Sequence, residues 1–184
     1  MRTPISPPLP DEYAPFYAGY VATVLNANVP AVLAIQPEAL AAACAGLTEG
    51  EALHRYAPEK WSVKEVVGHL ADAERIFAYR ALRIGRGDPT PLASFDENAY
   101  VAAARFDRMP LGDLIDDFDT ARQQTLSLLR AFGPDEWERT GTASGKTVST
   151  RAIFYITAGH VRHHLRILSS RYALPVQGEE GNDE

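Results

Sequence analysis

The segment VSTRAIFYITAGHVRHHLRILSSRY, residues 148–172, constrains the fold of this chain more than any other stretch. At about 100° per residue, its large apolar side chains fall on one side of a helix and its central arginines on the other. His160 and His164 lie about 40° apart inside the apolar arc, whereas His163 lies just outside it, about 60° from His160. The segment is therefore predicted to be a helix that turns two imidazoles toward the protein core.

A second long helix is predicted to begin at Ser62, because Ser62 and Glu65 have the spacing of a capping box. The GRGDP sequence at 85–89 ends this helix, and His69 lies on its apolar stripe. His69 is seven residues from the start of its helix, and His164 is eight residues from the end of the last one. If the two helices are antiparallel with level ends, all three inward histidines meet.

Three neutral imidazoles that converge in this way can bind one divalent metal ion at about 2.0–2.1 Å. His69, His160 and His164 are therefore candidate metal ligands. A site with three protein ligands leaves a coordination position open, which is typical of catalytic rather than structural metal sites. The other explanation of the pattern is that these are core histidines that form hydrogen bonds within the protein.

The remaining periodicity predicts an all-α protein with four long helices, and the chain shows no strand-like alternation. The first helix runs from about Asp11 to Ala45, with a break near Asn28. The third runs from about Leu111 to Phe132. The Gly-rich segment 141–146 is predicted to be a flexible turn before the last helix.

The connection between the second and third helices, residues 85–109, is too long for a tight antiparallel hairpin. It should contain a short helix over 97–104, capped by Asp96. A crossover of this length permits the second and third helices to run parallel. The fold class is therefore a four-helix bundle, and the whole chain, 1–184, is expected to form one domain.

Composition excludes several classes of function. The net charge of −6 and the pI near 5.4 leave no basic surface for nucleic acid. No apolar run approaches the roughly 20 residues that span a bilayer, and the N-terminus lacks the apolar core of a signal peptide. A single cysteine suits a cytoplasmic protein. The proline-rich residues 1–10 should form an extended arm, and the acidic residues 175–184 a disordered tail.

Arg80 lies on the apolar stripe of the second helix, where an aliphatic residue is expected. It either pairs with an acidic residue of the third helix, the preferred explanation, or binds a carboxylate substrate. Asp72 and Glu65 either orient His69 or are ordinary solvated charges. His163 is expected to be a surface residue or to support the site without binding metal.

Three further residue types are weaker candidates. Cys44 lies in an alanine-rich helix and shows no sign of activation, so it is expected to be a small core residue. Tyr17 and Tyr20 either line a pocket or pack in the core. His54 is expected to be an ordinary loop residue.

Two motifs carry a family resemblance over about residues 11–172: W-S-x-x-E-x-x-x-H, with Trp61, Ser62, Glu65 and His69, and H-x-x-x-H, with His160 and His164. Both resemble the DinB/YfiT-like superfamily of metalloenzymes, which implies a four-helix bundle of up-down-down-up order. The resemblance also implies one metal ligand on the second helix and two on the fourth. A glutamate often follows the first histidine of the last helix in the most similar subgroup. Val161 occupies that position here, so the role of the glutamate is absent.

The resemblance implies a divalent-metal-dependent enzyme, with a low-molecular-weight-thiol S-transferase as the leading hypothesis. The alternatives are a metal-dependent hydrolase and a non-enzymatic metal-binding stress-response protein. Zinc or nickel is expected ahead of iron or manganese, and imidazole-only ligation suits several of these metals. A small-molecule substrate and a homodimer are also expected, the dimer from the resemblance and the aromatic first helix.

Overall fold

The computed structural model describes residues 5–176 of the chain. In this part, short 3₁₀ turns connect helices and one small hairpin. The elements are η1 (Pro10–Glu12), η2 (Pro15–Tyr17), α1 (Ala18–Val24), α2 (Val29–Cys44), η3 (Glu51–Leu53), α3 (Val63–Gly85), α4 (Glu97–Ala104), η4 (Phe106–Arg108), α5 (Leu111–Ala131), α6 (Pro134–Glu138), β1 (Thr140–Ala143), β2 (Lys146–Ser149) and α7 (Thr150–Tyr172).

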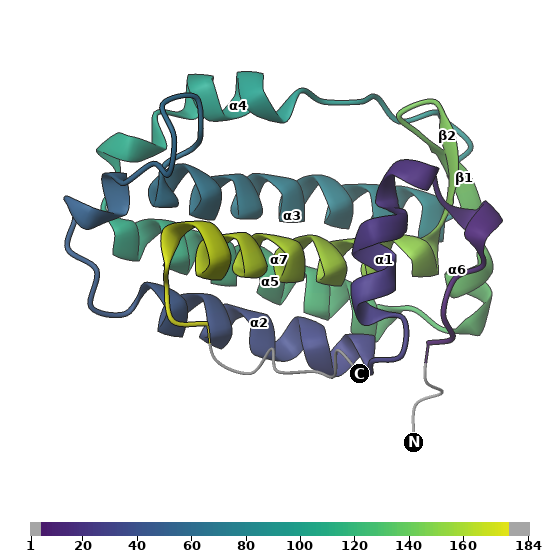
Figure 1. The fold of residues 1–184 in the computed structure, drawn as a ribbon. Helices are drawn as coiled ribbons and strands as arrows, with labels where there is room; N and C mark the ends of the chain where they lie inside the picture. The colour runs from purple at the N-terminus through teal and green to yellow at the C-terminus, as the bar shows by residue number, and fades with distance from the viewer. Residues whose placement is uncertain (1–4, 177–184) are drawn as a thin grey trace.

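Four long helices, α2, α3, α5 and α7, form the bundle (Figure 1). α3 packs on both α5 and α7, and α2 closes the ring by contacting the same two helices. Near the start of α3, Lys64 donates a hydrogen bond to the carbonyl of Met109, just before α5. At the end of α7, Tyr172 donates to the carbonyl of Trp61, just before α3. α3 and α5 therefore run in one direction and α7 runs against them. The predicted four-helix bundle is confirmed as a fold class.

Side-chain caps set the helix boundaries, largely where the sequence predicted them. The Ser62 hydroxyl accepts from the Glu65 amide at 3.0 Å, and the Glu65 carboxylate accepts from the Ser62 amide at 2.9 Å, which completes the capping box. Asp96 caps α4 in the crossover, as predicted. Asn28 caps α2 and marks the predicted break.

The N-terminal segment differs from the prediction of a helix that begins at Asp11. Two 3₁₀ turns come first, and the α-helix begins only at Ala18. Pro15 has no amide hydrogen and restricts the residue before it, so the chain cannot continue one regular helix through this position.

The hairpin β1–β2 is a second correction, because the sequence reading contained no strands. Its antiparallel register pairs Thr140 with Ser149 and Ala143 with Lys146. The two turn residues, Ser144 and Gly145, both have positive φ, at 53° and 71°, as the common two-residue hairpin turns require. Strands of four residues are too short to show a period, which is why the sequence predicts only a flexible turn at 141–146.

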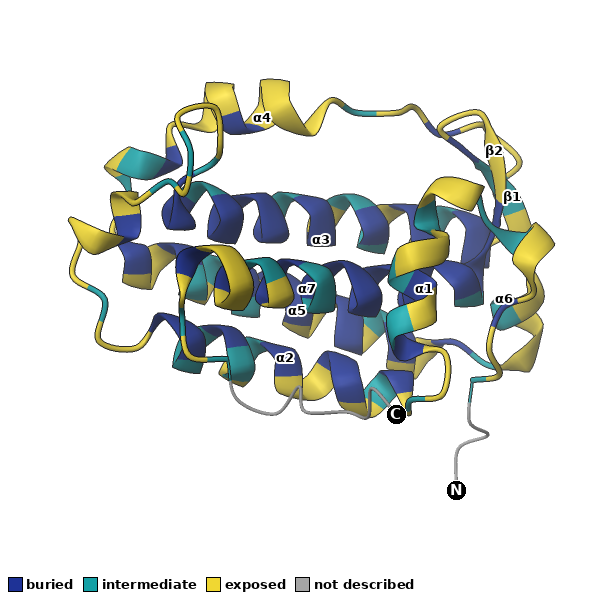
Figure 2. Cartoon of the chain, in the orientation of Figure 1, coloured by how far each residue is buried: buried dark blue, intermediate teal, exposed yellow. Residues whose placement is uncertain are grey.

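α7 is the central helix of the fold. Every residue from 152 to 161 is buried, so this half of α7 has no solvent face (Figure 2). The reason is that α1, α2 and α3 all pack on α7. α1 crosses the side of α7 that a four-helix ring would leave open (Figure 1).

A buried polar network lies at the centre of the bundle. Arg122 on α5 donates to both carboxylate oxygens of Glu74 on α3, at 2.7 and 2.8 Å. It also donates to the Leu33 carbonyl and the Gln36 side chain on α2. Gln36 in turn donates to the Ala158 carbonyl on α7, at 2.7 Å. All four helices are thus joined at one level, and the guanidinium charge is neutralised.

Some predictions fall on residues 1–4 and 177–184, which lie outside the described residues. They concern most of the acidic tail and the first part of the N-terminal arm. Within residues 5–176, no single helix is long and apolar enough to cross a membrane. The segments Pro15–Val24 and Val29–Cys44 meet that test only when taken together, and they are bent by 86°.

Candidate metal centre

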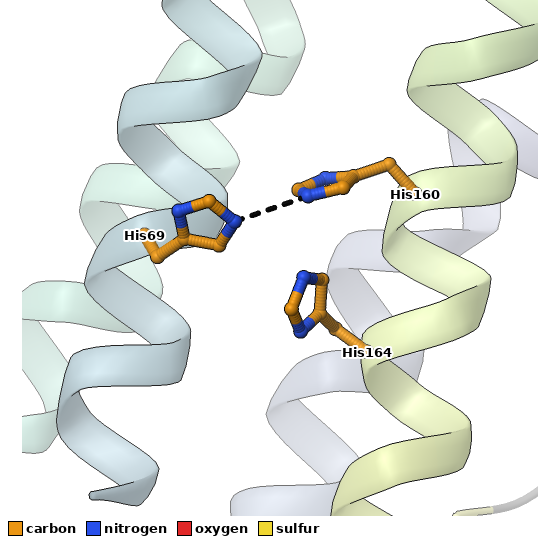
Figure 3. Close-up of side chains that lie close together, drawn as sticks. All are labelled: His69, His160 and His164. Carbon is orange, nitrogen blue, oxygen red and sulfur yellow. Dashed lines mark hydrogen bonds between the residues drawn. The ribbon is translucent and has the colours of Figure 1, made fainter. Parts of the chain in front are cut away.

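The structure brings His69, His160 and His164 together between α3 and α7 (Figure 3). One ring nitrogen from each residue lies within 4.8 Å of those of the other two. The Nε2 atoms of His69 and His160 are 3.1 Å apart. The ring centroids are 4.6 to 5.0 Å apart, so the three imidazoles share one small space.

Burial keeps these three imidazoles neutral. It lowers the pKa of His69 to about 4. Burial, followed by the charges of neighbouring histidines, lowers the pKa of His160 and of His164 well below the usual value. Neutral imidazole is the form that binds a metal ion, so the site is in its ligating state at neutral pH.

The hydrogen bonds of the cluster are incomplete. His164 Nδ1 is the one buried side-chain nitrogen or oxygen in residues 5–176 that has no hydrogen-bond partner. Leaving such a group unpaired costs about 1–3 kcal/mol. The explanation that all three are core histidines with satisfied hydrogen bonds therefore does not hold for His164.

The donor set fits a divalent ion. Imidazole nitrogens bind zinc and several other transition metals, and three of them leave an open position. Ligands bound at about 2.0–2.1 Å in tetrahedral geometry lie roughly 3.3 Å apart, so the observed separations require only a small closure. The structure thus supplies a three-histidine cluster, and the sharing of one ion stays a prediction.

His163 lies outside this cluster, on the side where the helical wheel placed it. Its ring packs against that of Tyr20, with the centroids 5.1 Å apart, and it is half-buried. Tyr20 also contacts His160, at 5.5 Å. His163 also packs edge-to-face on His164, with the centroids 5.2 Å apart, but it is not among the three residues whose ring nitrogens converge.

A pocket of ≈ 260 Å³ opens onto the three histidines. Glu97 is the one acidic residue of its lining, and Ser144 contributes a hydroxyl; no lysine or arginine lines it. The rest of the lining is mainly aromatic: Phe16, Tyr17, Tyr20, Trp61, Phe77 and Phe95. The pocket can therefore hold a small molecule in largely apolar surroundings, as ligand sites usually do.

One glycine allows this pocket to form against α7. A Cβ on Gly159 would lie 2.1 Å from the backbone oxygen of Tyr20. The absence of a side chain at this position lets α1 approach α7 closely enough to place Tyr20 over His160. On the opposite wall, Trp61 packs on His69, with the ring centroids 4.7 Å apart.

Arg80 does not pair with an acidic residue of α5, contrary to the preferred explanation. In the described chain, its Nη2 donates to the Ala93 carbonyl at 2.8 Å and to the Ser144 hydroxyl at 3.0 Å. The guanidinium also lies 5.8 Å from the centre of the Phe95 ring.

The two acidic residues near His69 have other partners. Glu65 caps α3 and pairs with Arg55, while Asp72 lies 3.8 Å from Arg75. Neither forms a hydrogen bond to His69 in residues 5–176, so the suggestion that they orient this ligand is wrong.

Cys44 is buried, and burial raises the pKa of its thiol to about 11, which agrees with a core residue. His54 ends η3 and contacts the Tyr172 ring. Phe95, Glu97 and Ser144 are pocket residues that the sequence analysis missed. They lie on the crossover and the hairpin turn, whose positions no helical period can reveal.

Comparison with known proteins identifies the family of this chain and a structure of similar fold. Residues 33–168 match the family described as the DinB superfamily, and this span contains all three histidines. No curated protein matches the chain significantly. The fold is similar to that of YfiT from Bacillus subtilis, described as a probable metal-dependent hydrolase with an unusual four-helix bundle topology. The TM-score is 0.72 over 80% of this chain and 87% of that one, at 19% identity, so the likeness concerns the fold.

Proposed function

This chain belongs to the DinB superfamily, and from that premise we propose that it is a divalent-metal-dependent enzyme acting on a small molecule. The observation that carries the proposal is the cluster of three buried imidazoles, His69, His160 and His164, at the base of a pocket. When bound there, a divalent ion supplies Lewis acidity, which lowers the pKa of a nucleophile in its open position.

The residues of the chain have separate roles in this proposal. His69, His160 and His164 hold the ion, and Trp61 and Tyr20 pack against their rings and limit their movement. The aromatic lining excludes water and binds apolar parts of the substrate. Such a lining strengthens electrostatic interactions at the reacting atoms.

Glu97 is the candidate general base. Its side chain lines the pocket. The pKa of Tyr20 is raised first by the burial of Tyr20 and then by the charge of Glu97, which places Glu97 near the histidine wall. A carboxylate can accept the proton that a nucleophile releases and return it to the leaving group. This arrangement favours hydrolysis, and the description of YfiT as a probable metal-dependent hydrolase supports the same reaction class.

Thiol S-transfer is the second candidate, and it rests on the family resemblance of the two histidine motifs. Cys44 cannot supply the thiol, because it is buried outside the pocket lining and its pKa is raised to about 11. A thiol-dependent reaction would therefore need a low-molecular-weight thiol as second substrate, bound in the same pocket.

The test is an activity screen on chelated protein reloaded separately with zinc, nickel, iron or manganese. Ester and amide substrates are run beside a panel of thiols with an electrophile. Turnover should require metal and should fall by about 10²- to 10⁴-fold in Glu97→Gln, while metal content stays unchanged. Metal-independent turnover, or none with any substrate in any metal form, would count against the enzyme proposal.

A further inference from the structure

Arg80 is a buried cation without a carboxylate partner in the described part of the chain. Its residue surface is 4% exposed, and no ion pair involves it in residues 5–176. Its contacts are two neutral oxygens, both reached through Nη2, and the face of Phe95. A buried charge is costly unless an opposite charge or a set of strong hydrogen bonds compensates it.

The remaining donors of Arg80 are accessible. Neither Nε nor Nη1 makes a hydrogen bond to the described residues. Within residues 5–176, His164 Nδ1 is the one side-chain nitrogen or oxygen that is both fully buried and without a hydrogen-bond partner, so Nε and Nη1 of Arg80 are in reach of a water-sized molecule. Arg80 lines a small cavity of ≈ 20 Å³ under the β1–β2 hairpin. The donors of the guanidinium are therefore free to bind something that enters this cavity.

The cavity is built for an anion. Besides Arg80, its lining contains Lys146, which forms no ion pair within residues 5–176, and it contains no acidic residue. Thr147 is its other residue with a hydrophilic side chain, apart from Tyr17, and the remaining residues are apolar. One buried cation, Arg80, and one exposed cation, Lys146, with no acidic residue among the described residues of the lining, favour a bound negative group.

This cavity adjoins the metal pocket. Tyr17 and Phe77 line both, and the hydroxyl of Ser144, which lines the metal pocket, accepts from Arg80 at 3.0 Å. The two cavities therefore share a wall, which places Arg80 next to the space that opens onto the histidines.

We propose that Arg80, assisted by Lys146, binds the carboxylate group of the molecule that the histidine pocket receives. Its Nε and Nη1 hydrogens, which make no hydrogen bond to the described residues, can each donate to a carboxylate oxygen. A cavity of ≈ 20 Å³ has room for about one water-sized group or a planar carboxylate, and less for a tetrahedral phosphate. That this molecule is the substrate of the histidine site rests on the proposed function, whereas the anion site itself does not.

The experiment uses the full chain after removal of metal with a chelator, so that no carboxylate can bind to an ion. Its thermal unfolding midpoint is measured in rising sodium acetate and in sodium chloride of equal ionic strength. Acetate should raise the midpoint in a saturable way beyond the effect of chloride. Arg80→Met should lose this response, and Arg80→Lys, which keeps the charge but lacks the Nε and Nη1 donors, should bind acetate about tenfold more weakly.

Arg75→Met is the matched control, because Arg75 lies on the same helix but pairs with Asp117 at the surface. It should respond to acetate as the parent protein does. If Arg80→Met does not fold, the decision rests on Arg80→Lys and Lys146→Met, both of which should weaken acetate binding.

Three results would overturn the proposal: no acetate effect beyond chloride, an unchanged response in the Arg80 variants, or stabilisation by inorganic phosphate but not by acetate. Because the measurement needs no metal and no turnover, a failed activity screen leaves it standing. Conversely, a failure here leaves the metal-site proposal intact.

Discussion

Two buried polar clusters lie in the same bundle and differ in how they are satisfied. In the first, Arg122 binds both oxygens of Glu74 and further acceptors on α2, so its charge and donors are matched within the protein. In the second, three histidines face one another, and the one hydrogen-bond distance between their rings is the 3.1 Å between Nε2 of His69 and Nε2 of His160. One of their nitrogens, His164 Nδ1, has no partner in the described residues.

The difference distinguishes a structural cluster from a proposed ligand site. Burying polar groups is tolerated when the protein completes their hydrogen bonds, as it does for Arg122. When it does not, the missing partner is expected to come from outside. The histidine cluster and Arg80 share this property, and both line cavities, whereas neither Arg122 nor Glu74 does so in the cavities described here. Incomplete satisfaction, rather than burial alone, is therefore the feature on which the two proposed ligand sites rest.

The largest expected effect is the pH dependence of the metal-free protein. The unfolded chain protonates histidine near pH 6.5, whereas burial lowers the folded-state pKa of His69 to about 4 and those of the other two well below normal. Below pH 6.5 protons therefore bind the unfolded state preferentially, and the free energy of unfolding falls. The loss by pH 5 should be about 2 kcal/mol per histidine, or about 6 kcal/mol for all three.

Urea denaturation between pH 7.5 and 5 measures this loss, in a range above the titration of most carboxylates. A variant with glutamine at all three positions should lose most of the pH dependence. If the parent and this variant have the same slope, the histidines are not buried as neutral groups.

The next largest effect concerns the satisfied cluster. Glu74→Ala leaves the Arg122 guanidinium buried without its carboxylate, so the free energy of unfolding should fall by about 3–5 kcal/mol in urea denaturation. As a control, Asp117→Ala removes the partner of Arg75 at the surface and should cost less than about 1 kcal/mol. Equal costs for the two changes would remove the distinction between the clusters.

Removing a histidine from the cluster should affect metal binding more than any outer contact does. His164→Ala, and likewise His69→Ala or His160→Ala, should lower metal affinity by more than about 100-fold, the upper range for loss of an outer partner. Competition with a chromophoric chelator measures the affinity. The same metal should stabilise the parent protein against unfolding, and should do so far less in these variants.

The smallest effect is expected at His163. Its ring contacts Tyr20 and His164, but its nitrogens are not part of the converging set, so His163→Ala should leave metal content nearly unchanged. Elemental analysis of the purified variants provides the comparison. Loss of metal in His163→Ala with retention in His164→Ala would show that the proposed ligand set is wrong.

Local features of the structure were accessible from the sequence because they depend on neighbours along the chain. The capping box at Ser62, the caps at Asp96 and Asn28, and the inward direction of the three histidines all follow from spacing within one helix. The level at which His69 meets the other two also followed, once the helices were taken as antiparallel. That assumption was needed because periodicity gives the face of a helix but not its partner.

Other features depend on contacts between segments that are distant in the chain. The hairpin was missed because its four-residue strands carry no readable period. The pairing of Arg122 with Glu74 links residues on two helices, and nothing in either helix alone selects the partner. For the same reason, the sequence could not show that Arg80 would lack an acidic partner within residues 5–176.

The sequence by itself determined the helical class, the main helix boundaries and the inward face that carries His69, His160 and His164, because hydrogen bonding and burial along one helix are local. The tertiary structure alone decided that α1 covers α7 at Gly159, that Phe95 and Glu97 reach the pocket from the crossover, and which buried polar groups stay incompletely satisfied. These outcomes depend on the packing of several helices at once, and only the folded chain specifies which groups face each other across the core.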